Sequence, residues 1–499
     1  MNYISTRGKG ESIKASEAIR LGIAGDGGLF TPESIPRFTS IEMQSMVNSN
    51  YQDLATLILS RFLSDYPQGE LQKMIQEAYS YPEKFDHPEV TPIRTLGDQR
   101  YLLDLWHGPT CAFKDIALQL LPHLMTKASE LSSERKEIVI LVATSGDTGK
   151  AALEGFKNVP GTRIIVFFPE QGVSEIQRLQ MVTQEGNNTH VVSVRGNFDD
   201  AQSGVKQIFG DSLLAGKLSQ NNLAFSSANS INWGRLAPQI VYYFYGYNAL
   251  CGKKAIRMGD KVNIAVPTGN FGNILAAYIA GQMGLPIHKF ICASNSNNVL
   301  TDFIKTGCYD RNRQFFATIS PSMDILISSN LERLLYYFSD GDSGLVKDWM
   351  NQLNTSGRYQ VNGSTAEKIH GGFFGGYASE TQTLAQIGKV FQEKNMIIDP
   401  HTAVGVEVHE QYLRESGDNT PVLIASTASP FKFNASVLKA LGEEVNGVNE
   451  FALLEKLESL AGFKIPRSLA ELARKDIRHS GGCAKEEMGK EVQKILGIQ

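Results

Sequence analysis

The segment HGPTCAFKD at residues 107–115 contains the side chain with the clearest chemical potential in the chain, Lys114. Lys114 follows Phe113 and precedes the apolar run IALQLLPHLM, which predicts a buried helix. Burying a lysine among apolar side chains costs free energy unless the amine is paired, deprotonated or chemically occupied. Asp115 is the obvious ionic partner. The alternative is a surface lysine, but the setting favours an imine-forming amine whose pKa falls through desolvation.

The segment GNFGN at residues 269–273 has the properties of a phosphate-binding turn. It follows the apolar run VNIAVPT and opens the apolar run NILAAYIAGQMG, so its N–H groups lie at a predicted helix N-terminus. Gly269 and Gly272 permit close backbone approach, and Asn270 and Asn273 carry amide donors. The alternative is a βα turn without a ligand. The segment is not G-x-G-x-x-G and lacks the lysine of a P-loop.

A second turn of this kind is TSGDTG at residues 144–149, again between an apolar strand pattern and a helix pattern. Its N–H groups and the hydroxyls of Ser145 and Thr148 suit a carboxylate. The alternative is a helix cap made by Asp147 or Thr148, and the two roles can coexist. Late in the chain, Ser426 and Thr427 follow the apolar run VLIA.

Together these patterns predict a pyridoxal 5'-phosphate enzyme. The aldehyde would bind Lys114, the phosphate would bind GNFGN, and a hydroxyl at residues 426–427 would face the pyridine nitrogen. A nucleotide-binding oxidoreductase would instead need an acidic ribose ligand about 20 residues beyond the glycine-rich turn. The sequence there, IHKFICASNSNN, has no Asp or Glu. A non-catalytic binding protein would not need this set of three motifs.

The elements that must position these motifs are strands and helices in alternation. Short β-branched runs alternate with amphipathic helices from about residue 90, which is typical of βαβ units. We expect an α/β fold with two lobes of mostly parallel, twisted sheet and a ligand cleft between them. The predicted regions are a helical N-terminal lobe at 1–88, a catalytic region at 89–450 (a smaller lobe at about 100–212 and a larger one at about 213–450) and a helical cap at 451–499.

Composition argues for a small-molecule partner. The 48 basic and 52 acidic residues give a formal net charge of −4, which predicts no nucleic-acid or membrane partner. The five cysteines form no C-x-x-C pair, so we expect neither disulfides nor a metal site, and a reducing, cytoplasmic location. The N-terminal segment is charged, and no run of about 18 apolar residues occurs, so we expect no export signal and no membrane span.

The assembled motifs resemble the threonine synthase family of fold-type II pyridoxal phosphate enzymes, whose fold is like that of the tryptophan synthase β subunit. The segments that carry the resemblance stand in family order over nearly the full length: STRG, GIAGDGGLF, HGPTCAFKD, ATSGDTGKAAL, NSINWGR, PTGNFGN, SPSMDILISSNLERLL, DPHTAVG and ASTASPFKF. HGPTCAFKD and GNFGN are the specific pair. TSGDTG resembles a turn in other members of the fold.

The resemblance implies a role for each motif. Lys114 would bind the cofactor aldehyde and then act as the proton-transferring base, and Thr427 would face the ring nitrogen. The cofactor phosphate would bind Gly269, Asn270, Phe271, Gly272 and Asn273. The substrate carboxylate and the 3'-hydroxyl side of the cofactor would meet Ser145, Asp147 and Thr148. The substrate phosphate would meet Asn229, Ser230, Asn232 and Arg235, for which a solvated loop is the alternative.

The implied reaction converts O-phospho-L-homoserine and water to L-threonine and phosphate, the last step of threonine biosynthesis, by γ-elimination and β-addition. The alternative is a related phospho-lyase that gives a 2-keto acid. The resemblance is compatible with a monomer or a homodimer. One departure is STASPFKF where the family usually has STAHPAKF, so Ser429 and Phe431 replace a histidine and an alanine. The resemblance therefore assigns to Ser429 no role that needs a histidine.

Overall fold

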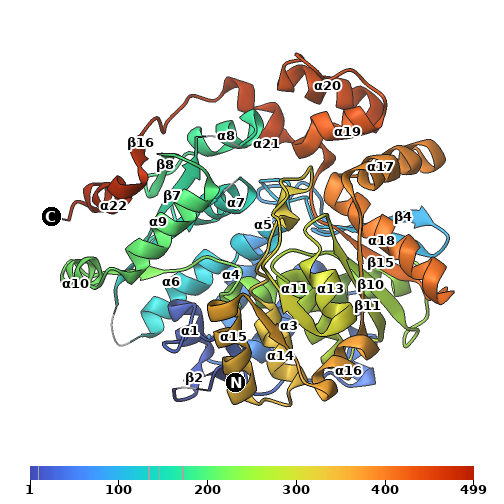
Figure 1. The fold of residues 1–499 in the computed structure, drawn as a ribbon, viewed down its shortest axis with the longest axis horizontal. Helices are drawn as coiled ribbons and strands as arrows, with labels where there is room; N and C mark the ends of the chain where they lie inside the picture. Colours follow the sequence, from blue (N-terminus) through green and yellow to red (C-terminus); the bar gives the residue numbers. More distant parts are fainter. Residues whose placement is uncertain (9, 133–134, 145, 171–172, 499) are drawn as a thin grey trace.

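The computed structural model describes residues 1–8, 10–132, 135–144, 146–170 and 173–498. It contains two separate, mostly parallel sheets, each with helices packed against it (Figure 1). This arrangement confirms the predicted α/β class. The predicted boundaries at residues 88 and 450 stay predictions.

The smaller sheet has five strands in the order β16-β8-β7-β6-β9, and all neighbours are parallel. Its strands are β6 (Glu137–Ala143), β7 (Thr162–Pro169), β8 (Thr189–Arg195), β9 (Leu223–Ser226) and β16 (Gly482–Ala484). The helices around it are α7 (Asp147–Phe156), α8 (Glu175–Val182), α9 (Phe198–Gly210) and α10 (Ser212–Gln220). The apolar runs EIVILVAT, RIIVFFP and HVVSVR therefore form the strands that their pattern predicts.

The larger sheet has six strands in the order β14-β11-β10-β15-β5-β4. Its strands are β4 (Ile93–Gly97), β5 (Arg100–Asp104), β10 (Val262–Pro267), β11 (Ile287–Ser294), β14 (Phe373–Tyr377) and β15 (Val422–Ser426). Only the β4–β5 pairing in this sheet is antiparallel. Because β15 lies between β10 and β5, Thr427 follows a central strand, next to the end of β5.

Helices with continuous apolar surfaces bury the larger sheet. α11 (Trp233–Gly252) and α12 (Gly272–Gln282) are buried along most of their length, as expected for helices that are hydrophobic on all sides. The other helices of this lobe are α13 (Val299–Thr306), α14 (Leu331–Phe338), α15 (Ser343–Ser356), α16 (Gly363–Gly372), α17 (Glu380–Lys394) and α18 (Pro400–Ser416). β12 (Cys308–Asp310) and β13 (Arg358–Gln360) pair as a small two-stranded antiparallel sheet, with α14 and α15 between them in the chain.

Two helices carry the lysine motif into this core. α5 (Lys114–Leu118) and α6 (Leu121–Leu131) follow β5, and Leu118, Leu121 and Leu124 belong to the main hydrophobic cluster. α5 packs against both α7 of the smaller lobe and α11 of the larger lobe. Lys114 therefore lies where the two lobes meet.

The N-terminal region is more than the predicted helices. Besides α1 (Ala15–Leu21), α2 (Ser40–Ser45), α3 (Tyr51–Phe62) and α4 (Gln68–Ala78), it contains an antiparallel sheet of β1 (Asn2–Ser5), β2 (Ile13–Lys14) and β3 (Phe30–Pro32). Its helix α3 packs on α11. The N-terminal region and the larger lobe thus share one hydrophobic cluster.

The C-terminal segment connects the two lobes. α19 (Asn434–Ala440) and α20 (Glu450–Ala461) lie beside α17, and the chain then passes α21 (Arg467–Ala470) to reach β16 and α22 (Met488–Leu496) at the smaller sheet (Figure 1). β16 pairs with β8, and α22 packs on α9. No helix in the described part of the chain is both long enough and apolar enough to span a bilayer.

Candidate active site

Lys114 is the first residue of α5, and its side chain is only 11% exposed. Its amine donates to Oγ of Ser322 at 3.0 Å and to Oδ2 of Asp147 at 3.5 Å. Burial lowers the pKa of Lys114, Asp147 opposes that effect, and the nearby cations Lys432 and Arg235 add to it. The amine is therefore easier to deprotonate than an exposed lysine, as the sequence predicts.

Asp115 is not the partner of Lys114, contrary to the sequence prediction. Its carboxylate accepts hydrogen bonds from the backbone N–H of Thr110 at 2.8 Å and from the Thr110 hydroxyl at 2.7 Å. Consecutive residues of a helix do not share a face, so Lys114 and Asp115 point in different directions. Burial raises the pKa of Asp115 to about 6, although the bonds from Thr110 act against it.

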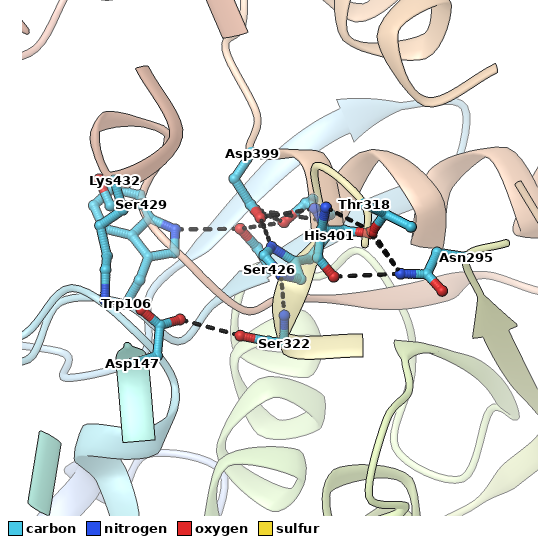
Figure 2. Close-up of polar contacts among 12 residues, drawn as sticks. Trp106, Asp147, Asn295, Thr318, Ser322, Asp399, His401, Ser426, Ser429 and Lys432 are labelled. Atoms are coloured by element: carbon cyan, nitrogen blue, oxygen red, sulfur yellow. Dashed lines mark hydrogen bonds and ion pairs between the residues drawn. The ribbon is translucent and has the colours of Figure 1, made fainter. Parts of the chain in front are cut away.

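Asp147 is the ionic partner that the site uses. It begins α7 and is buried, with Lys432 Nζ at 2.6 Å from Oδ1 and the Ser322 hydroxyl donating to Oδ2 at 3.1 Å (Figure 2). Gln177 donates to Oδ1 at 3.3 Å. Burial alone would raise the pKa of Asp147, but Lys432 and Lys114 outweigh it and hold the pKa well below its usual range. Asp147 is therefore a permanent anion in the site.

The turn that carries Asp147 is capped by a different residue. The hydroxyl of Thr144 accepts from the backbone N–H groups of Gly146 and Gly149, both at 3.0 Å. The capping role that the sequence offered to Asp147 or Thr148 therefore belongs to Thr144. Thr148 is half-buried, and Ser145 lies outside the described residues.

GNFGN forms the start of α12. The cap residue Phe271 has a left-handed backbone (φ 63°), and no side chain caps this helix within the described chain. Oδ1 of Asn273 accepts from the hydroxyls of Tyr242, at 2.8 Å, and Tyr243, whereas Nδ2 of Asn273 is buried and has no partner among the described residues. Asn270 is exposed. An uncapped helix start beside an unpaired amide donor suits an anion.

Gly269 is required by a close approach of two loops. A Cβ atom at this position would be 2.8 Å from the backbone oxygen of Ser322. The hydroxyl of Ser328 donates to the backbone oxygen of Gly269 at 2.7 Å, which fixes the same contact. The loop that contains Ser322 is therefore held against GNFGN.

Thr427 lies on the other side of Lys114. Its backbone oxygen accepts from the N–H of Phe113 at 2.9 Å, and its hydroxyl has no hydrogen-bond partner among the described residues. Ser426 differs, because its hydroxyl accepts from Trp106 Nε1 at 3.2 Å and from the Thr402 hydroxyl at 3.3 Å. Of the two hydroxyls that the sequence offered, that of Thr427 is available to a ligand.

The segment NSINWGR splits into residues with different surroundings. Asn232 caps α11 through Oδ1 and uses both amide hydrogens on the backbone oxygens of Ile19 and Ser227, so it has no donor left for a phosphate. Arg235 is buried, and its Nε has no partner in the described part of the chain. Burial lowers the pKa of Arg235 to about 10, although Asp115 acts to raise it. An unpaired guanidinium donor near Lys114 suits an anionic group.

The loop with Asn229 and Ser230 is tied to GNFGN. Asn229 is exposed and Ser230 is half-buried. The amide of Asn330 donates to the backbone oxygens of Ser230, at 3.2 Å, and Asn270, at 3.1 Å. The structure thus brings both predicted phosphate-binding segments to one place through a residue that the sequence reasoning did not identify.

Three further residues of the site were missed. Lys432 and Ser322 contact Asp147 directly, and His401 accepts from the backbone N–H of Ser322 at 3.2 Å through Nε2 (Figure 2). Nδ1 of His401 lies 2.8 Å from Asp399, which fixes its ring. All of them lie in quoted segments, ASTASPFKF, SPSMDIL and DPHTAVG, but nothing local in those segments indicates that they meet Asp147.

Comparisons with known proteins identify the family to which this chain belongs. Family models match three consecutive parts of the chain: "Threonine synthase N terminus" at residues 2–79, "Pyridoxal-phosphate dependent enzyme" at 85–427 and "Threonine synthase, C-terminal" at 402–479. The chain belongs to the threonine synthase family of pyridoxal-phosphate-dependent enzymes. The resemblance read from the motifs is confirmed.

Individual members of the threonine synthase family agree with this result. Threonine synthase from Saccharomyces cerevisiae is 38% identical over 521 residues, covering 98% of both chains. The human protein "Threonine synthase-like 1" is 42% identical over 445 residues, but the chain spans only 58% of its length. The crystal structure of "PLP bound Threonine synthase" from Brucella melitensis has a TM-score of 0.88 at 34% identity, covering 99% of both chains.

The residues present fit the family's cofactor. Pyridoxal phosphate needs an amine, a phosphate cradle and a contact for its ring nitrogen. Lys114 supplies the buried amine, the uncapped start of α12 with the unpaired amide of Asn273 supplies donors for a phosphate, and Thr427 supplies a free hydroxyl. The donor set is thus complete without any residue beyond those that the structure brings together.

Proposed function

We propose that this chain catalyses the conversion of O-phospho-L-homoserine and water to L-threonine and inorganic phosphate. The single observation that carries the proposal is the buried amine of Lys114, which contacts Asp147 and lies near two further cations, Lys432 and Arg235. Arg235 keeps an unpaired Nε among the described residues, so the site offers a charged donor to a substrate that carries anionic groups. Membership of the threonine synthase family supports the same reaction.

In the proposed mechanism, bound pyridoxal phosphate supplies an electron sink for negative charge at the substrate carbons. Lys114 is the group that holds the cofactor aldehyde and then, as a free amine, removes the proton from Cα. A second proton leaves Cβ as phosphate leaves Cγ, and a proton then adds at Cγ to complete the methyl group. Water adds its hydroxyl group at Cβ, and a proton returns to Cα. Lys114 is placed for these transfers because Ser322 and Asp147 hold its amine from one side.

The other residues bind and orient. The start of α12, with Gly269 to Asn273, would hold the cofactor phosphate, and Thr427 would face the ring nitrogen. Thr148 and Ser145 would line the side of the substrate carboxylate, and Asp147, which is itself an anion, would lie on the side of the cofactor's 3'-hydroxyl. Arg235, with Asn229 and Ser230, would meet the substrate phosphate through its unpaired Nε. Asn232 would support this loop as the cap of α11.

Two further properties belong to this proposal. We infer a cytoplasmic enzyme, because the five cysteines are free in the structure. We also infer a monomer or homodimer, with which the family resemblance is compatible. Size-exclusion chromatography with light scattering measures the second property directly.

The test is a product assay. Purified protein loaded with pyridoxal phosphate is incubated with O-phospho-L-homoserine, and threonine, 2-oxobutyrate and phosphate are quantified. Equal amounts of threonine and phosphate are the expected result. Phosphate release with 2-oxobutyrate in place of threonine would replace the proposal with a related phospho-lyase.

The role of Lys114 is tested by substitution. Lys114→Ala should abolish turnover while the thermal midpoint changes little, because the removed amine is only one of the partners of Asp147. Borohydride reduction of the loaded parent protein, followed by peptide mass spectrometry, should place the cofactor on Lys114. Lys254→Ala, at an exposed position, is the matched control. Near-normal turnover of Lys114→Ala, or a label on another lysine, would contradict the assignment.

A further inference from the structure

Lys432 is the buried cation of this site that no motif predicted. It lies in the short 3-10 helix Pro430–Phe433, which follows Thr427 by a few residues. Its side chain is 0% exposed, and its amine is 2.6 Å from Oδ1 of Asp147. A lysine with no exposed surface is costly to bury, so a position that retains one needs a reason in charge as well as in packing.

Two amines share one carboxylate in this arrangement. Lys432 is 2.6 Å from Oδ1 of Asp147, whereas Lys114 is 3.5 Å from Oδ2. Attraction between opposite charges weakens with distance, so Asp147 stabilises the charged form of Lys432 more than that of Lys114. The Ser322 hydroxyl also donates a hydrogen bond to Oδ2 of Asp147, the oxygen that Lys114 contacts. Lys114 is therefore the weaker competitor for the only carboxylate that it contacts among the described residues.

The other charged groups around Lys114 do not compensate for this. Arg235, from α11, is a third cation that acts on Lys114, and Asp115, in its own helix, is turned toward Thr110. His401, from α18, faces the Ser322 backbone and Asp399. Asp147 from α7 is left as the only nearby anion that contacts Lys114 in the described part of the chain.

We propose that Lys432 is a positioning residue that keeps Lys114 available as a neutral amine, by taking Asp147 as its own ion-pair partner and by adding a second positive charge to the same buried pocket. The inference rests on the proposed function, in which Lys114 acts as a nucleophile toward the cofactor and as a base toward Cα. Both tasks require a neutral amine. The lowered pKa of Lys114, caused first by burial and then modified by Asp147, Lys432 and Arg235, agrees with this assignment.

A purely structural role for Lys432 makes a different prediction. If Lys432 only fills space, a methionine of similar length should replace it without changing the chemistry of Lys114. If its charge acts on Lys114, the same replacement frees Asp147 to pair with Lys114 and removes a repulsive neighbour. Both changes favour the protonated form of Lys114, so its pKa should rise.

The experiment measures the protonation of Lys114 in full-length protein freed of cofactor. Trace acetic anhydride acetylates neutral amines, and peptide mass spectrometry gives the labelling of Lys114 at each pH relative to the exposed Lys254. The cofactor aldehyde must reach the same amine, so this smaller reagent has access to it. In Lys432→Met the midpoint of Lys114 labelling should rise by about one pH unit or more. In Lys432→Arg, which keeps the charge, it should stay near the parent value.

Asp147→Asn should shift the labelling midpoint of Lys114 in the opposite direction. Loss of the negative charge of Asp147 should lower the pH at the midpoint of Lys114 labelling. If substitution merely loosened the pocket, that midpoint would instead rise in both Lys432→Met and Asp147→Asn, toward the value of an exposed lysine. An unchanged midpoint in Lys432→Met, or equal midpoints in Lys432→Met and Lys432→Arg, would overturn the proposal. A raised midpoint in Asp147→Asn would overturn it as well, even if Lys432→Met gave no folded protein.

The loaded enzyme gives an independent readout. If Lys114 must be neutral to act, the acidic limb of the pH profile of kcat should move to higher pH in Lys432→Met and return in Lys432→Arg. The labelling experiment uses neither cofactor nor substrate. A keto-acid product in the assay above would therefore change the proposed function without affecting the labelling result.

Discussion

Asp147 receives contacts from four side chains that come from separate parts of the chain. Lys114 precedes it, Gln177 follows in the same lobe, and Ser322 and Lys432 come from the larger lobe. A buried carboxylate is costly unless it is paired, and Asp147 has several partners, of which Lys432 is the nearest cation. Asp147 thus fixes the relative position of the two amines in the site.

Ser322 is the neutral member of this group, and its removal is our prediction at the residue scale. Its hydroxyl accepts from Lys114 at 3.0 Å and donates to Asp147 at 3.1 Å. Ser322→Ala removes both bonds and should cost about 1–3 kcal/mol of transition-state stabilisation, because charged groups lose a fixed partner. The measurement is kcat/KM with O-phospho-L-homoserine. We expect a decrease of roughly ten- to a hundredfold, with the thermal midpoint nearly unchanged.

Ser364→Ala, an exposed serine on α16, is the control for this substitution. It should keep the activity of the parent. If Ser322→Ala and Ser364→Ala had equal kcat/KM, the hydroxyl of Ser322 would have no part in holding Lys114.

At this scale, the sequence predicted residues whose local context is unusual. Lys114 sits in an apolar segment, Asp147 lies in a turn of small residues, and Thr427 follows an apolar run, so their local patterns made them candidates that the combination of motifs then supported. Lys432 and Ser322 have ordinary neighbours in sequence. Their importance comes from contacts with Asp147, which is far from both of them along the chain. Asp115 shows the converse error, since adjacency in sequence suggested an ion pair that helix geometry prevents.

At the scale of elements, the site depends on how α12 begins. Phe271 takes a left-handed backbone, which is unusual for a residue with a side chain, and the Ser322 loop lies against Gly269. Together these features leave the first N–H groups of α12 uncapped by any side chain of the described residues. The loop therefore shapes the proposed phosphate cradle without contacting it through a charged group.

Gly269→Ala tests this arrangement. Its Cβ would be 2.8 Å from the backbone oxygen of Ser322, which cannot rotate away, so the loop must shift. We expect a loss of about 1–3 kcal/mol in the free energy of unfolding and a weaker hold on the cofactor. Urea unfolding and equilibrium dialysis of pyridoxal phosphate measure the two effects.

Gly281→Ala in the same helix is the matched control. A Cβ there meets its nearest side chains at 3.5 Å, an ordinary contact, and alanine favours a helix by about 0.5–1 kcal/mol over glycine. Gly281→Ala should be neutral or stabilising and should retain the cofactor. If the two variants lost cofactor equally, the close approach at Gly269 would not explain the cradle.

The strands that the sequence predicted are those with long apolar runs. The runs before TSGDTG and GNFGN became β6 and β10 because buried parallel strands need apolar side chains on both faces. β1, β2, β3 and β16 gave no such signal, since they are two to four residues long and are held largely by backbone pairing. A strand of this kind is defined by its neighbour rather than by its own residues.

At the scale of the whole molecule, pH should act through a buried histidine far from the lysine pair. His409 is 2% exposed, and neither ring nitrogen has a partner among the described residues. It lines a cavity of about 540 Å³ together with Arg100 and Glu410, beside Val422 at the start of β15. The active-site residues follow the opposite end of that strand. Burial, with help from Arg100, lowers the pKa of His409 to about 4.

The direction in which pH changes the stability of the protein follows from the lowered pKa of His409. The unfolded chain binds a proton at the ordinary value of 6.5, whereas the folded protein binds it only near 4. The contribution of neutral His409 to the free energy of unfolding is therefore fully present above pH 6.5. It is lost as the pH falls toward 4, and the loss reaches a limit of roughly 3 kcal/mol. Between pH 7.5 and 4.5, the urea concentration at the unfolding midpoint should fall further for the parent than for His409→Gln.

His370→Gln, at an exposed position of α16, serves as the control and should follow the parent at both pH values. An equal loss in the parent and in His409→Gln would mean that other groups cause the acid sensitivity.

The sheet topology has a consequence for how the protein matures in the cell. β8 pairs with β16, which lies almost three hundred residues further along the chain. β5 pairs with β15, which lies more than three hundred residues further along. On the ribosome, both sheets therefore stay open at these positions while most of the polypeptide is made, and open strand edges invite wrong partners. The nascent enzyme should depend on chaperones until translation passes residue 484, and its cofactor site is incomplete until Thr427 and Lys432 have been made.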